Sequence, residues 1–123
     1  MGEVYVPIVV VNPRTGERSE EIVALADTGA TLPLIPATLL KSVGIHSTGT
    51  IGVVLADGRR ATRTIGDAVV AVQGASTPCR VVFGEERDAA LLGLTVLEQL
   101  GLTVDPIERR LVPRDFLLYT AAR

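Results

Sequence analysis

The sequence predicts a small all-β protein, a closed or partly closed barrel with one or two short helices. Short β-branched and apolar runs alternate with turn residues along the chain, which is typical of barrels and sandwiches. Apolar residues make up 47% of the 123 residues and aromatic residues only 3%. We therefore expect one domain whose core consists of closely packed Val, Leu, Ile and Ala side chains.

The N-terminal part reads as a hairpin. Residues 4–11 form a β-branched run that Pro7 interrupts, so we expect a strand at the edge of a sheet. Residues 12–16 (Asn-Pro-Arg-Thr-Gly) carry a strong turn signal. Residues 20–26 then return as a second strand, which ends directly before Asp27.

The middle of the chain predicts a short strand, a short helix and a hairpin. Residues 32–35 form the strand, and the helix covers residues 37–43 between Pro36, which suits a first helical position, and Gly44, which suits a helix end. Residues 51–55 and 59–65 form the hairpin, because Asp57-Gly58 supplies the positive φ angles that a tight turn needs.

The C-terminal half predicts a second hairpin, from 67–72 over 73–76 to 78–83. Residues 91–92 are apolar on both faces and read as a central strand. A helix follows over residues 95–100, with Val96, Leu97 and Leu100 on its apolar side. The last predicted hairpin pairs 103–105 with 110–112.

Composition narrows the function. A net charge of −2 gives no reason to expect nucleic-acid binding. We find neither a secretory apolar region nor an apolar run near the ~20 residues that span a bilayer, so we expect no membrane partner. The single Cys79 cannot form an intrachain disulfide, fits a reducing, cytoplasmic compartment and reads as a small buried hydrophobe. One cysteine and one histidine, His46, make a zinc site implausible, and we expect neither metal nor cofactor.

Two short motifs carry the chemistry. The apolar run 23–26 ends in Asp27-Thr28-Gly29-Ala30. A carboxylate at the end of an apolar strand indicates a functional residue, because burying an unpaired charge is unfavourable. An ordinary turn is the alternative, since Asp, Thr and Gly are common turn residues. The second motif is Leu91-Leu92-Gly93, which precedes the second predicted helix.

In this order, the two motifs resemble those of the retropepsin-like aspartic proteases, the retroviral proteases and their cellular relatives, including bacterial ones. The resemblance covers roughly residues 4–113. It implies an acid-protease barrel that forms a homodimer, and an aspartic endopeptidase that acts on a polypeptide substrate without a cofactor. We assign residues 1–113 to the protease domain and residues 114–123 to a C-terminal tail that is a candidate interface segment.

The resemblance also implies roles for single residues. Asp27 from each subunit would form the catalytic pair, and Thr28 would reach across the two-fold axis to the partner's backbone. Gly29 would allow close approach of substrate, Ala30 would form a small wall, and Leu91 would line a subsite. The hairpin of residues 51–65 would be the flap that closes over substrate, and its tip comprises Leu55, Ala56, Asp57, Gly58 and Arg59.

This chain departs from the retroviral pattern in two places. The flap tip carries charges instead of a glycine-rich run, and Thr31 and Leu94 stand where retroviral members have an Asp and an Arg that form an ion pair. Both departures occur in cellular relatives and do not predict an inactive protein. Two readings without catalysis remain open: a dimeric peptide-binding β module of the same fold, and a structural β domain with an incidental Asp-Thr-Gly turn.

Overall fold

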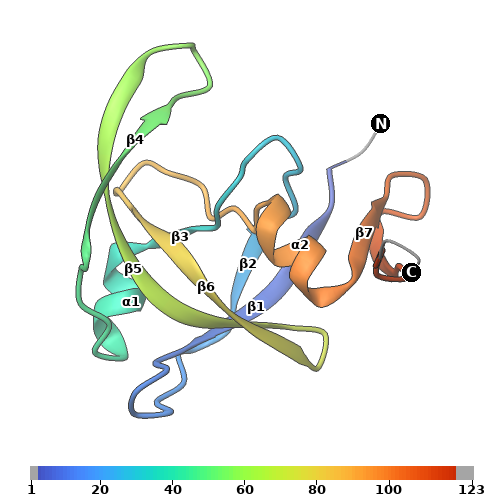
Figure 1. The fold of residues 1–123 in the computed structure, drawn as a ribbon, viewed down its shortest axis with the longest axis horizontal. Helices are drawn as coiled ribbons and strands as arrows, with labels where there is room; N and C mark the ends of the chain where they lie inside the picture. The colour runs from blue at the N-terminus through green and yellow to red at the C-terminus, as the bar shows by residue number, and fades with distance from the viewer. Residues whose placement is uncertain (1–2, 119–123) are drawn as a thin grey trace, which may run out of the picture.

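Eight strands and two short helices follow one another along residues 3–118, the part of the chain that this computed structural model describes. Six strands belong to one sheet, and the last two form a separate two-stranded sheet at one side (Figure 1). The elements are β1 Tyr5–Val11, β2 Ile22–Leu25, β3 Leu34–Pro36, α1 Ala37–Ser42, β4 Gly49–Val54, β5 Arg60–Val72, β6 Ala75–Gly84, α2 Leu94–Leu100, β7 Leu102–Asp105 and β8 Arg110–Pro113.

The large sheet closes into a barrel through a single residue. Its strands lie in the order β2-β1-β5-β6-β3. Leu91 lies between the two ends of this series, parallel to Leu25 of β2 and antiparallel to Leu34 of β3. Leu91 and Leu34 exchange both backbone hydrogen bonds at 2.9 Å, and the Leu92 N–H donates to the Leu25 carbonyl at 2.8 Å. The predicted barrel is confirmed. In place of the predicted strand 91–92, the structure has the single residue Leu91, which forms a β-bridge on each side.

The prediction that β1 lies at a sheet edge is wrong. β1 pairs antiparallel with β2 over residues 5–8 and with β5 over residues 8–11. Pro7 is tolerated inside the sheet because β5 begins to pair only at Ile8. A residue without an N–H therefore leaves no donor missing on that side of β1.

The two hairpins predicted over residues 51–65 and 67–83 share one continuous strand. β5 runs for 13 residues from Arg60 to Val72, through Gly66, which lies between the two predicted strands 59–65 and 67–72. Figure 1 shows β5 descending from the projecting β4–β5 hairpin and curving under the barrel to meet β6. The turn from β5 to β6 is also tighter than predicted, because only Gln73 and Gly74, with φ of 52° and 82°, connect the strands.

The core has the predicted aliphatic composition. Asn12 and Thr77 are the buried polar residues in the described part of the chain. The Asn12 Nδ2 donates to the Val43 carbonyl at 2.8 Å and its Oδ1 accepts from the Arg14 N–H at 2.8 Å, so this side chain ties separate segments together. Among residues 3–118, no helix is long and apolar enough to cross a membrane. The largest fully buried side chains are Ile8, Ile35, Leu40, Leu92, Leu97, Val4, Val10, Val43, Val70, Val72, Val81 and Val96.

Candidate active site

The Asp27 loop is held by its own backbone. β2 brings the buried Ala24 to the barrel wall, and two residues after the strand ends Asp27 emerges half-buried at the rim. Its Oδ1 accepts the Gly29 N–H at 2.8 Å, and its backbone carbonyl accepts the Ala30 N–H at 3.2 Å. The carboxylate is thus fixed on a tight turn.

The residues that follow the second motif hold this loop through backbone hydrogen bonds. The Leu94 N–H donates to the Ala30 carbonyl at 2.7 Å, and the Thr95 N–H donates to the Thr31 carbonyl at 3.1 Å. Gly93 adopts a φ of 77°, and a Cβ at this position would lie 2.7 Å from the carbonyl carbon of Leu32. Only glycine allows the start of α2 to approach the loop so closely. The two motifs, far apart in the chain, therefore lie together.

The other predicted loop residues lie at the same rim. Thr28 and Gly29 are exposed, and Ala30 is half-buried. Leu91 is half-buried at the barrel closure, beside Leu25. The reach of Thr28 to a partner and the subsite role of Leu91 remain predictions, because both concern a second chain or a substrate.

The predicted flap is a hairpin that projects from the barrel (Figure 1). At its tip, the Gly58 N–H donates to the Leu55 carbonyl at 2.9 Å and the Leu55 N–H donates to the Arg59 carbonyl at 2.7 Å. Asp57 accepts the Arg59 N–H at 3.0 Å and the Arg59 Nε–H at 2.7 Å. The backbone bond from Arg59, followed by its guanidinium, lowers the pKa of the Asp57 carboxyl below its ordinary value. The tip therefore carries a local salt bridge between Asp57 and Arg59, which the sequence had not predicted.

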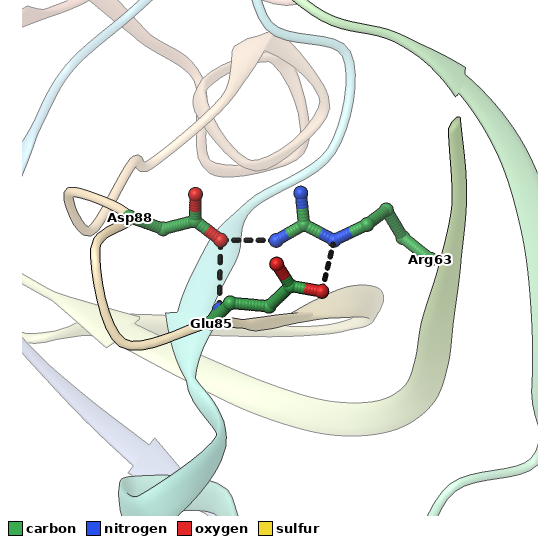
Figure 2. Close-up of polar contacts among 3 residues, drawn as sticks. All are labelled: Arg63, Glu85 and Asp88. Carbon is green, nitrogen blue, oxygen red and sulfur yellow. Dashed lines mark hydrogen bonds and ion pairs between the residues drawn. The ribbon is translucent and has the colours of Figure 1, made fainter. Parts of the chain in front are cut away.

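The root of the hairpin holds a charge cluster that sequence reasoning missed. Figure 2 shows Arg63 of β5 reaching toward Asp88 and Glu85, which lie in the turn after β6. The Arg63 Nη2 pairs with Asp88, and its Nε lies 3.7 Å from a Glu85 carboxylate oxygen. The Arg63 side chain is only 10% exposed. The one signal in the sequence was an arginine within a strand opposite a charged loop, and nothing local indicated that they meet.

One sizeable cavity does not include the Asp27 loop. It has a volume of about 820 Å³ and lies beside the hairpin root. The cavity therefore adds nothing to the candidate site, which rests on the hydrogen-bonded Asp27 loop. The residues lining the cavity are Pro36, Ala37, Thr38, Lys41, Ile45, His46, Ser47, Thr62, Arg63, Thr64, Phe83, Gly84, Glu85, Glu86 and Asp88.

The described residues contain no cluster of three or more His, Cys, Asp and Glu side chains that could hold a metal ion. Cys79 packs half-buried against the core. Burial, with a smaller contribution from the negative charge of Asp67, raises the pKa of its thiol to about 12. A thiol that remains protonated is a poor nucleophile. Cys79 thus packs as a small hydrophobe, half-buried where the sequence predicted a buried one.

Comparison with known proteins reveals the fold. No family model matches the sequence, and no significant match is found among curated proteins. The solution structure of the simian foamy virus protease is similar with a TM-score of 0.53 and 19% identity, over 78% of this chain and 93% of that one. A retropepsin-like aspartic protease from Rickettsia conorii is similar with a TM-score of 0.51 and 18% identity, over 85% and 90%.

A third similar structure is the foamy viral protease–reverse transcriptase in complex with an RNA/DNA hybrid. It has a TM-score of 0.58 and 20% identity, over 86% of this chain but only 14% of that longer one. Likenesses at this identity establish the fold alone. The chain has the fold of the retropepsin-like aspartic proteases.

Proposed function

We propose that this protein is an aspartic endopeptidase that works as a homodimer, with Asp27 from each subunit in one catalytic pair. The observation that carries the proposal is the Asp27 loop. Its carboxylate is fixed by the Gly29 N–H at 2.8 Å. Its backbone is fixed to the start of α2 by the Leu94 bond of 2.7 Å to Ala30. This preorganised carboxylate at the rim of a retropepsin-like barrel matches the position that the motif implies.

A pair of carboxyl groups can do what one cannot. Two carboxyls held close together cannot both ionise, so they share one proton, and one then accepts a proton from water while the other donates to the substrate carbonyl. The sequence contains a single Asp-Thr-Gly. A two-fold symmetric contact brings identical atoms of two chains together, so it supplies the second carboxyl. The exposed Thr28 would then reach the partner's loop.

The substrate in this proposal is an extended polypeptide. It would lie between the Asp27 loop and the β4–β5 hairpin, with Leu91 beside the catalytic pair. Closure of the hairpin tip, residues 55–59, would exclude water from the reacting carbonyl. The salt bridge between Asp57 and Arg59 would make this tip stiffer than a glycine-rich flap tip.

Asp27→Asn tests the catalytic assignment. We expect the purified variant to fold but to lose about 10²–10⁴-fold or more in peptide cleavage, because the amide cannot act as a base. The measurement is cleavage of a peptide library across pH, with and without pepstatin. Asp67→Asn, at an exposed position of β5, is the matched control and should cleave as the wild type does. Undiminished cleavage by Asp27→Asn contradicts the proposal.

Mixing subunits tests the shared site. Excess Asp27→Asn chains, given time to exchange, should lower activity further than dilution with buffer does, because most wild-type chains would then lie in mixed dimers with one carboxylate. Excess Asp67→Asn chains should add activity instead. A protein that sediments as a monomer and cleaves peptides would overturn the dimer mechanism. A wild-type dimer that binds peptides without cleaving them would instead indicate the non-catalytic binding module.

A further inference from the structure

Arg63 is an unusual residue for the root of a projecting hairpin. It belongs to the part of β5 that pairs with β4, where it lies opposite Ile51. Most residues of this hairpin are exposed or half-buried without charge partners, yet the Arg63 side chain is 10% exposed and lies between two carboxylates. Because a buried arginine must be paired and hydrogen-bonded to be tolerated, its partners are part of the structure around it.

The partner segment is a closed turn. The Asp88 N–H donates to the Glu85 carbonyl at 2.9 Å, and the Asp88 carboxylate accepts the Glu85 N–H at 2.7 Å. Arg63 binds this turn at two points, through Nη2 to Asp88 and through Nε toward Glu85, as Figure 2 shows. A lysine has one charged nitrogen and cannot reproduce this two-point contact.

The turn leads directly to the Asp27 loop. Three residues after Asp88 the chain reaches Leu91, which closes the barrel against Leu25. Leu25 lies two residues before Asp27, and the Leu25 N–H donates to the Ala90 carbonyl at 2.9 Å. Ion pairs, backbone hydrogen bonds and short stretches of the chain itself therefore connect the hairpin root to the candidate catalytic loop.

We propose that Arg63 is a positioning residue for substrate binding, which clamps the turn of residues 85–88 to the root of the β4–β5 hairpin. The clamp holds two walls of the peptide cleft, the hairpin and the segment leading to Leu91, at a fixed spacing. The inference rests on the proposed function for its effect on substrate. The clamp itself is a property of the free protein. Asp88, whose side chain is 27% exposed, is the main partner, and Glu85, at 76%, contributes less because solvent screens it.

Hydrogen exchange of the free protein tests the clamp without any requirement for activity. Arg63→Gln should accelerate amide exchange about tenfold in both residues 85–91 and the β4–β5 hairpin, because one contact restrains both segments. Asp88→Asn should do the same, and combining the two should add little. Arg80→Gln, an equal charge change at an exposed position of β6, is the matched control. Exchange that is unchanged, or equally faster in Arg80→Gln, overturns the proposal.

Cleavage kinetics test the consequence for substrate. Arg63→Gln should raise KM about tenfold while kcat per titrated active site stays within about threefold, because the Asp27 pair is intact and the cleft is looser. Arg63→Lys should recover part of the KM loss. A drop in kcat with unchanged KM would indicate a merely structural residue and contradicts the inference.

Three further outcomes are separable. If Arg63→Gln does not fold, Asp88→Asn carries both tests, because its amide oxygen can still accept the Glu85 N–H. If the wild type cleaves no peptide, the proposed function fails, and hydrogen exchange still decides whether the clamp exists. If cleavage is normal and exchange shows no coupling between the two segments, only the clamp fails.

Discussion

The two halves of β5 have the same backbone conformation and opposite environments. Residues 60–64 pair with β4 alone, and all of them are exposed or half-buried. Residues 65–72 pair with β6, and from Val69 onward also with β1. In that half, Ala68, Val70 and Val72 face the core, and Ile65 is buried on the opposite face of the strand. One strand therefore serves both as a projecting hairpin and as a barrel wall.

The difference shows what determines local stability here. A strand with neighbours on both sides and a buried face opens only when the barrel unfolds, whereas a hairpin with one neighbour can open by itself. Arg63 lies at the end of the hairpin half, two residues before the first residue that pairs with β6. The charge cluster of Arg63, Glu85 and Asp88 thus lies at the boundary between the hairpin half and the barrel half of β5.

The largest expected effect on stability is in the barrel half. Val70→Ala removes methyl groups from a side chain that is 0% exposed, so it should lower the free energy of unfolding by about 2 kcal/mol through lost burial and a residual cavity. Val54→Ala in the hairpin, at 69% exposure, should change it by less than about 0.5 kcal/mol. Urea denaturation of both variants measures the contrast. Equal losses would remove the distinction between the two halves.

Gly66→Ala tests the junction between the halves. An added Cβ would lie 2.9 Å from Cε1 of Phe83 and 3.0 Å from the carbonyl oxygen of His46. Overpacking of this kind costs about 1–3 kcal/mol, so we expect a smaller urea midpoint. The matched control is Gly52→Ala in β4, where no atom lies within 4 Å of the added Cβ. A neutral Gly66→Ala would mean that Phe83 moves aside at little cost.

The smallest expected effect is at the hairpin tip. Asp57→Asn should leave the urea midpoint unchanged and accelerate amide exchange in residues 55–59, because it removes the charged acceptor for Arg59. The lowered pKa of Asp57 sets the pH dependence: its ordering effect is present above the ordinary value of 3.8 and is lost as the pH falls through the lower folded value. Protection of the tip that is already lost at mildly acidic pH would contradict this assignment.

Local signals predicted the two turns around Asp27 and Asp57 well. Asp57-Gly58 does make the hairpin turn, and Asp27-Thr28-Gly29-Ala30 does follow a strand as a tight turn. These features depend on φ preferences and short-range hydrogen bonds, which a few neighbouring residues determine. Two of the errors in the fold come from the same kind of signal. Pro7 suggests an edge strand, and the predicted strands stop on either side of Gly66. In the structure, β5 pairs with β1 only from Ile8 onward, and Gly66 lies inside β5, packed against Phe83.

By itself, the sequence determined the aliphatic core, the turns and the short elements between them, because burial and turn chemistry act over a few residues. Only the tertiary structure decided which strands are neighbours, that Leu91 closes the barrel between Leu25 and Leu34, and that Arg63 meets Asp88. Such contacts join positions far apart in the chain. Their formation depends on the barrel closing as a whole, and no local pattern of residues encodes that closure.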